Sequence, residues 1–150
     1  MSRPEKKRIV HNPPVFVNFK PVGVRASSIA QIFLTLDEYE AIRLADSLGM
    51  EHSEAAEEME ISRSTFTRLV EKARKKVAEF MVEGKELIIE GGNIHFRGNL
   101  IRCLDCGHMF KTSFEDEMIK CPVCGSANLL DLAGGFGHGN CCKGRHRGRR

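Results

Sequence analysis

The sequence has no tryptophan and a single tyrosine, although it contains nine phenylalanines. It has no apolar run of about 18 residues, which excludes a membrane-spanning helix. The N-terminal stretch MSRPEKKRIV lacks the apolar segment of a signal peptide, so we expect a cytoplasmic protein. A Gly-rich phosphate loop, a nucleophile elbow and a His-Glu-x-x-His pattern are also absent. These absences predict a soluble protein that is not an enzyme.

The 150 residues are 41% hydrophobic and 29% charged, which is typical of a folded protein of one medium or two small domains. The net charge of +3 hides a strong segregation of charge. Basic clusters lie near the N-terminus, in residues 62–76 and in the C-terminal tail, and they would attract a DNA duplex. An acidic stretch separates the first two clusters, and it is either a solvated face or a surface for a basic partner. Its acidic residues are Asp37, Glu38, Glu40, Asp46, Glu51, Glu54, Glu57, Glu58 and Glu60.

Residues 51–80, EHSEAAEEMEISRSTFTRLVEKARKKVAEF, predict a short helix, a tight turn and a longer basic helix. Ser62 is a suitable N-cap for the longer helix, because its hydroxyl can accept from free first-turn amides. Apolar residues then recur at three- and four-residue steps from Phe66 to Phe80. This order is typical of a helix-turn-helix, whose second helix lies in the DNA major groove. An ordinary helical hairpin with a basic face is the alternative.

Seven polar residues lie off the apolar stripe of the longer helix, and we predict that they contact DNA. Arginine can bridge O6 and N7 of guanine, and hydroxyl groups can donate to phosphates or bases. The predicted base-facing residues are Arg63, Ser64, Thr67 and Arg68, and the predicted phosphate-facing residues are Lys72, Lys75 and Lys76.

Two segments precede the predicted helix-turn-helix. Residues 35–48 predict a supporting helix that begins with a Thr-x-x-Glu capping box completed by Glu38. Residues 1–34 contain four prolines and the alternating run VFVNF, which predict an extended arm or one edge strand packed by Phe16 and Phe19. The basic arm either reaches a DNA groove or is a loose terminus.

The segment from TLDEYEAIRL to KKVAEFMVEGKEL resembles the DNA-binding region 4 of sigma-70-type sigma factors. With FKPVG upstream and LIIEGG downstream, it is more similar to a family of small prokaryotic proteins described only as DNA-binding by prediction. The resemblance covers residues 3–92 and depends mainly on DEYEAIRL, EAAEEM and SRSTFTRLVEKARKKVA. It implies DNA binding and names no target gene. The chain departs from the family pattern at Glu60, where the turn commonly holds glycine, and at Glu51, where Ser or Thr often caps the first helix.

Four cysteines form two Cys-x-x-Cys-Gly pairs separated by fourteen residues. In a reducing compartment this spacing indicates a metal site rather than disulfides. Four thiolates close the tetrahedral shell of Zn²⁺, which predicts a structural site. The pairs resemble the knuckles of rubredoxin-type zinc ribbons, and a rubredoxin-like iron centre for electron transfer is the alternative. The predicted ligands are Cys103, Cys106, Cys121 and Cys124.

The glycine-rich tail GGFGHGNCCKGRHRGRR predicts a disordered basic extension with affinity for phosphates. A second metal site or a thiol sensor is the sharper interpretation of its cysteines and histidines. Its candidate residues are His138, Cys141, Cys142 and His146.

Together these patterns predict an α+β protein with four parts. They are an extended arm (1–34), a helix-turn-helix domain (35–83), a β hairpin with a zinc ribbon (84–132) and a flexible tail (133–150). The hairpin is predicted from ELIIEGGNIHFR, in which Gly-Gly-Asn separates two β-type runs.

The predicted function is a transcriptional regulator that binds double-stranded DNA sequence-specifically and carries one structural zinc. A homodimer is one oligomeric state that the sequence leaves open. The alternatives are an adaptor that contacts RNA polymerase or another transcription protein, and a metal or redox carrier that uses the cysteines.

Overall fold

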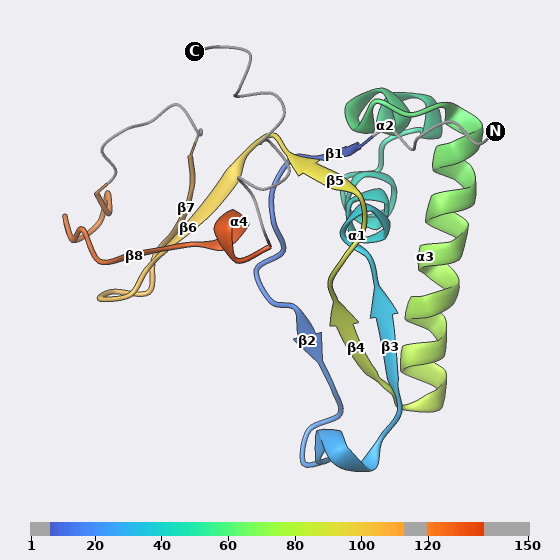
Figure 1. Ribbon diagram of the computed structural model, residues 1–150, viewed down its shortest axis with the longest axis horizontal. Helices are drawn as coiled ribbons and strands as arrows, with labels where there is room; N and C mark the ends of the chain where they lie inside the picture. Colours follow the sequence, from blue (N-terminus) through green and yellow to red (C-terminus); the bar gives the residue numbers. More distant parts are fainter. Residues whose placement is uncertain (1–6, 113–119, 137–150) are drawn as a thin grey trace. The chain divides into compact units, whose positions relative to one another are not determined.

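A computed structural model describes residues 7–112 and 120–136 (Figure 1). It contains both helices and strands, which confirms the predicted α+β fold class. The chain divides into two compact units, which are described separately below. Unit 1 comprises residues 1–9 and 16–94, and unit 2 comprises residues 10–15 and 95–150.

Unit 1 contains the long helices, and α3 packs against both α1 and α2. The helix predicted over residues 35–48 is present, but its last part is wound as a π-helical turn. As the capping box predicts, the Thr35 backbone N–H donates to the Glu38 carboxylate at 2.9 Å. The helical elements of unit 1 are η1 (Ala26–Ser28), α1 (Leu36–Ile42), η2 (Arg43–Ser47), α2 (His52–Met59) and α3 (Arg63–Glu83).

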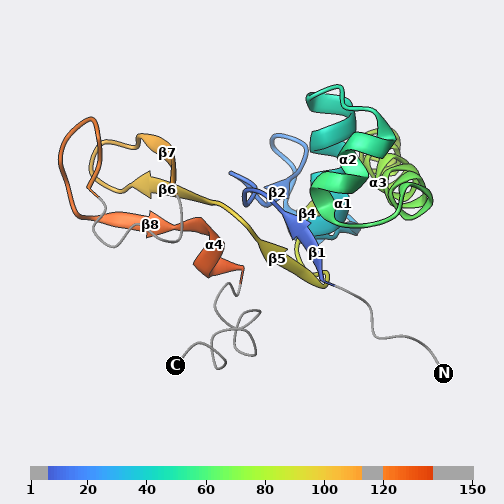
Figure 2. The ribbon, with the colours of Figure 1, turned by 90° about the horizontal axis from the view of Figure 1, so that it is seen from above.

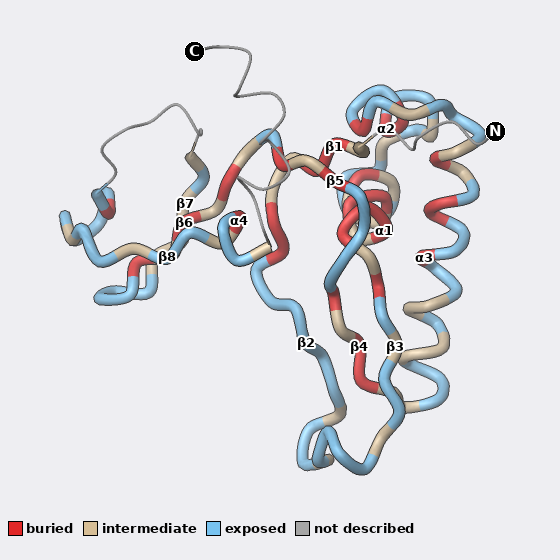
Figure 3. The backbone as a smooth tube through the Cα atoms, in the orientation of Figure 1, coloured by how far each residue is buried: buried red, intermediate tan, exposed pale blue. Residues whose placement is uncertain are grey.

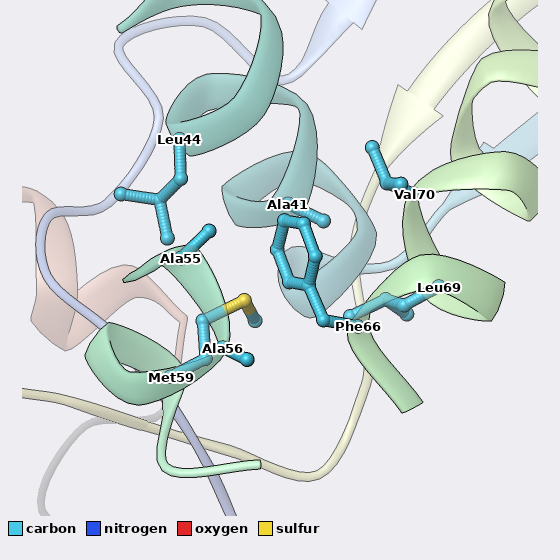
Figure 4. Packing of buried hydrophobic residues seen from close by; sticks show 8 residues of the cluster. All are labelled: Ala41, Leu44, Ala55, Ala56, Met59, Phe66, Leu69 and Val70. Carbon is cyan, nitrogen blue, oxygen red and sulfur yellow. The ribbon is translucent and has the colours of Figure 1, made fainter. Parts of the chain in front are cut away.

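One cluster of buried side chains holds α1, η2, α2 and α3 together (Figure 4). Phe66 is fully buried, and its ring points from α3 toward Ala41 of α1 (Figure 4). The small side chains of Ala55 and Ala56 in α2 allow the helices to approach closely. The buried members are Ala41, Leu44, Ala55, Ala56, Met59, Phe66, Leu69 and Val70.

A three-stranded sheet completes unit 1, with β4 (Glu86–Ile89) between β2 (Asn18–Phe19) and β3 (Gln31–Leu34). β4 is antiparallel to β2 and parallel to β3 (Figure 1). α3 contacts β3 and β4, where Leu34 and Ile89 are buried. The core of unit 1 is therefore not formed by the predicted helix-turn-helix domain alone, because the sheet contributes to it.

The predicted β hairpin over residues 86–97 is also wrong. β4 pairs within the sheet of unit 1, whereas β5 (Ile94–Phe96) pairs with β1 (Arg8–Val10). The division between the units falls within both strands of that second pair. The two runs look like a hairpin in the sequence because a glycine turn separates them. Their actual partners lie more than about 50 residues earlier in the chain, where no local pattern can reveal them.

Residues 1–34 do not form one extended arm, because they supply β1, β2, η1 and β3. The two phenylalanines predicted to pack this segment are both exposed. The side chain of Phe16 is 62% exposed and that of Phe19 is 42% exposed.

Unit 2 is built on β6 (Asn99–Cys103), which pairs antiparallel with β7 (Met109–Thr112) and β8 (Leu129–Asp131) (Figure 2). A short helix, α4 (Leu132–Gly135), follows β8. The Asn99 amide ties these parts together by donating to Asp131 at 2.6 Å and accepting from the Ala133 N–H at 3.0 Å. Few apolar side chains of unit 2 are buried in the part of the chain that the structure describes. They are Val10, Pro13, Pro14, Phe96, Ile101 and Ala133, together with Cys103 and Cys121.

Within residues 7–112 and 120–136, no helix combines the length and the apolar character needed to cross a bilayer.

Candidate functional site

α2 and α3 are joined by a three-residue turn whose local geometry follows from its sequence. Glu60 ends α2 in the left-handed conformation, with φ of 56° and ψ of 44°. The chain thus adopts at Glu60 the conformation that glycine favours, at a steric cost of roughly 1–2 kcal/mol for a residue with a Cβ. Ser62 begins α3, and its hydroxyl accepts from the Thr65 N–H at 3.2 Å. The predicted N-cap is therefore confirmed.

Exposed and buried positions alternate along α3 (Figure 3), and a run of its exposed positions is basic. Arg68, Lys72 and Lys75 are exposed and follow one another at four- and three-residue spacing, so they share one face of the helix. Ser64 begins this face, and Arg63 is also exposed at the first turn. No carboxylate of the described residues lies within ion-pair distance of these four cations. Their charge is therefore available to an external anion.

Two other basic residues of α3 are engaged within unit 1. The Lys76 ammonium lies 2.6 Å from an Oε1 oxygen of Glu38, which is buried in α1. The Arg74 guanidinium donates two hydrogen bonds to Asp46, at 3.0 and 2.7 Å. Lys76, a predicted phosphate contact, thus forms an internal ion pair, which compensates the buried Glu38 carboxylate.

The acidic stretch is not one uniform solvated face. Asp37, Glu38 and Glu40 are buried, and each forms an ion pair, with Arg8, Lys76 and Arg43 respectively. Burial of a carboxylate is costly unless it is paired, so these residues act in the structure of unit 1. Asp46 of η2 is exposed and pairs with Arg74. The other exposed carboxylates lie on or beside α2, and they are Glu51, Glu54, Glu57, Glu58 and Glu60.

Thr67, a predicted base contact, is half-buried and engaged by a residue that the sequence analysis did not identify. Its Oγ1 atom lies 2.8 Å from Nδ1 of His52, the first residue of α2. The His52 ring also lies edge-on to Phe66, with 5.3 Å between centroids. The fifteen-residue separation of His52 and Thr67 in the sequence hides this contact.

Unit 2 brings the four predicted cysteines together. Their sulfur atoms all lie within 4.8 Å of one another. The Sγ–Sγ distance is 3.5 Å for Cys103 and Cys124 and also 3.5 Å for Cys106 and Cys121. Four thiolates at 2.3 Å from a tetrahedral zinc ion lie about 3.8 Å apart, so the cluster has the dimensions of a single-ion site.

The two Cys-x-x-Cys turns have matching backbone geometry. The Gly107 N–H donates to the Cys103 carbonyl at 2.9 Å, and the Gly125 N–H donates to the Cys121 carbonyl at 2.8 Å. Both glycines have positive φ, 80° and 73°, which requires the freedom of glycine. The sequence pattern Cys-x-x-Cys-Gly therefore encodes the turn as well as the ligands.

Hydrogen bonds lower the pKa of one thiol in the cluster and link its two turns. The Cys106 backbone N–H donates to the Cys103 sulfur at 3.4 Å and lowers the pKa of that thiol to about 7. Hydrogen bonds from Ser126 and from Asn128 lower the pKa of Asp105, which lies inside the first turn. Because both donors follow the second turn, Asp105 links the two turns. This donor set suits a metal ion that prefers thiolates.

The four cysteines differ in exposure, since Cys103 and Cys121 are buried whereas Cys106 and Cys124 are exposed. A closed set of four sulfur ligands leaves no open coordination position, so such a site can hold a metal but offers no place for a substrate. The tail residues His138, Cys141, Cys142 and His146 lie outside the described residues.

Fold and site define a small α+β protein with an exposed basic helix in one unit and a four-cysteine cluster in the other. Comparison with known proteins adds the family. Residues 1–97 match the family described as "Protein of unknown function DUF134", and the chain belongs to that family. The matched residues end just before β6, so the family match does not extend to the cysteine cluster.

Relatives called "UPF0251 protein" cover the cysteine region as well. The protein of Chloroherpeton thalassium is 49% identical over 152 residues, covering 99% of each chain. That of Moorella thermoacetica is 38% identical and covers 97% of this chain and 100% of its own. That of Pelotomaculum thermopropionicum is 43% identical over 84% of this chain and 95% of its own. No solved structure matches the chain.

Proposed function

We propose that this protein is a transcriptional regulator that binds double-stranded DNA sequence-specifically through α3. The exposed basic face of α3, which follows a short helix and a three-residue turn, carries this proposal. The order of elements matches a helix-turn-helix, in which the second helix enters the major groove. The base-reading candidates near the start of α3 are Arg63, Ser64, Thr67 and Arg68. Lys72 and Lys75 lie further along and would contact phosphates.

Arg74 and Lys76 hold α3 against η2 and α1, so we assign them to positioning rather than to DNA contact. This assignment leaves four cations on α3 for the duplex: Arg63, Arg68, Lys72 and Lys75. Each phosphate contact contributes to the salt dependence of binding. We therefore consider the slope of the logarithm of affinity against the logarithm of salt concentration. Its magnitude should fall by about one when Lys72 or Lys75 is replaced, and it should stay unchanged when Lys76 is replaced.

We further propose that the cysteine cluster binds one zinc ion with a structural role. The size of the cluster and the closed set of four thiolates support a structural ion. Elemental analysis of the purified full-length chain should give one zinc per chain and a colourless protein. A red protein with iron in place of zinc would instead support the redox carrier.

Selection of duplexes from a random DNA pool tests the proposed DNA binding. The zinc-loaded full-length protein should enrich a motif, and the Arg63→Ala, Arg68→Ala double variant should lose it. The matched control is the Lys20→Ala, Arg25→Ala double variant, because these exposed cations lie in unit 1 but outside α3. Each lost base contact should cost ~1–3 kcal/mol.

Two results would contradict the proposal. Binding without any enriched motif, or equal loss of the motif in the control variant, would reduce α3 to a non-specific cationic surface. Capture of RNA polymerase without DNA binding would favour the adaptor function instead. A palindromic motif would indicate a homodimer on the DNA.

A further inference from the structure

His52 is held against the start of α3 by two contacts. Its Nδ1 lies 2.8 Å from Thr67 Oγ1, and its ring meets the fully buried Phe66 edge-on at an interplanar angle of 70°. The packing against Phe66 fixes the orientation of the ring, so Nδ1 stays directed at the threonine hydroxyl. His52 belongs to α2 and Thr67 to α3, so the contact spans the turn between them.

The protonation state of the imidazole decides whether the Thr67 hydroxyl can donate a hydrogen bond to another molecule or can only accept one. A hydroxyl has one proton and two lone pairs, and a bare imidazole nitrogen is an acceptor. When Nδ1 carries no proton, the Thr67 hydroxyl donates a hydrogen bond to His52, and only its lone pairs are left for a base. When the ring is protonated, Nδ1–H donates to Thr67, and the hydroxyl proton becomes free for another acceptor.

We propose that His52 is a specificity-determining residue, which acts through Thr67 and sets the base that this threonine prefers. The proposal depends on the DNA binding proposed above. As an acceptor, Thr67 would favour the amino groups of adenine or cytosine. As a donor, it would favour N7 and O6 of guanine or O4 of thymine. His52 itself is a positioning residue and touches no base in this scheme.

Charged groups from two neighbouring elements act on this pair. The Asp46 carboxylate of η2 interacts electrostatically with His52. Arg74 of α3 neutralises part of that effect by binding Asp46. Arg63 and Glu71 lie one turn before and after Thr67 on α3, and they oppose one another in charge. The charged groups around His52 and Thr67 thus include both signs.

Selection from a random DNA pool at about pH 8 and at about pH 5.5, on either side of the range in which imidazole titrates, tests the inference. In the wild-type protein, the preference at one base position should change about fivefold between the two conditions, the worth of one hydrogen bond. The His52→Gln and Thr67→Val variants should each give the same motif at both pH values. The His108→Gln variant is the control, because it removes a histidine of unit 2 and should keep the wild-type change.

A wild-type motif that is the same at both pH values would overturn the inference while leaving the proposed DNA binding intact. A pH-dependent change that persists in both His52→Gln and Thr67→Val would overturn it as well. If neither the wild-type protein nor any variant enriches a motif, the proposed function itself is contradicted. Because Thr67 is outside the buried cluster of unit 1, Thr67→Val provides the test even if His52→Gln disturbs the fold.

Discussion

Unit 1 buries Phe66, Met59 and Leu44 in one cluster of apolar side chains, whereas unit 2 buries two of its four clustered cysteines among few apolar residues. In unit 1 removal of apolar surface from water stabilises the fold. In unit 2 that contribution is small, so the proposed zinc ion would supply much of the folding free energy. The comparison predicts that the two units respond to different perturbations, and the following experiments test this from the largest effect to the smallest.

Metal removal should unfold unit 2 and leave unit 1 folded. Structural zinc sites contribute on the order of 10 kcal/mol to folding, far more than the small core of unit 2 can replace. Addition of a chelator, or the Cys103→Ala substitution, should collapse the amide NMR dispersion of residues 99–112 while the helical circular dichroism of unit 1 persists.

The control for this prediction is Val123→Ala, which changes a 67% exposed residue between two cysteines and keeps all four thiolates. It should retain the metal and the dispersed spectrum. If metal-free unit 2 keeps its dispersion, the metal does not stabilise it as we describe.

Phe66→Ala should produce the opposite pattern. Truncation of a fully buried phenylalanine costs ~3–5 kcal/mol through lost contacts and a cavity. Denaturant unfolding followed by helical circular dichroism should show this loss in unit 1, with the metal content unchanged. Phe33→Ala is the matched control, because Phe33 is 45% exposed and should cost less than ~1 kcal/mol. If both variants lose similar amounts of unfolding free energy, Phe66 is not a main contributor to the core of unit 1.

Lys76→Met and Lys75→Ala should separate stability from DNA binding on one helix. Glu38 is buried, and its Oε2 atom has no hydrogen-bond partner among the described residues. Its Oε1 atom accepts from Thr35, and Lys76 supplies the opposing charge. Because the Lys76 side chain is 23% exposed, its loss should cost about 2 kcal/mol rather than the full value for a buried pair. Denaturant unfolding should detect this destabilisation, with little change in the salt slope of DNA binding.

Lys75→Ala should change stability by less than about 0.5 kcal/mol and lower the salt slope by about one unit. If Lys76→Met lowers the salt slope and leaves stability unchanged, Lys76 contacts DNA after all.

The smallest expected effect belongs to the exposed pair of Asp46 and Arg74. The hydrogen bond from Arg74 lowers the pKa of Asp46, so the pair stabilises the fold fully above the unfolded carboxyl pKa of about 4. Its contribution is lost as the pH falls through the lower, folded pKa. After allowance for solvent screening, Arg74→Ala should cost about 0.3 kcal/mol near pH 7. Thermal unfolding should show no difference between the variant and the wild type near pH 2, and a difference that persists there would contradict the assignment.

Local patterns in the sequence predict local structure well. Ser62 caps α3, Glu38 completes the capping box of α1, and the two Cys-x-x-Cys-Gly turns bring four sulfurs together. Each of these features depends on residues a few positions apart, where spacing fixes geometry. The elements and ligands of the candidate sites could therefore be predicted without a structure.

The misses involve partners distant in the sequence. β4 takes its partners from β2 and β3, and the ion pair of Glu38 with Lys76 joins residues 38 positions apart. Lys76 looks like its neighbours in the sequence, and only the fold distinguishes it from Lys75. His52 was overlooked for the same reason, because its partner Thr67 lies across the turn.

The most direct test of the central proposal is an NMR titration of the zinc-loaded, full-length chain with the enriched duplex. Amide shifts should change most from Arg63 to Lys75 in α3, and the Arg63→Ala, Arg68→Ala variant should show no such change. Shift changes confined to unit 2, or unchanged spectra in α3 at saturating duplex, would contradict DNA recognition by this helix.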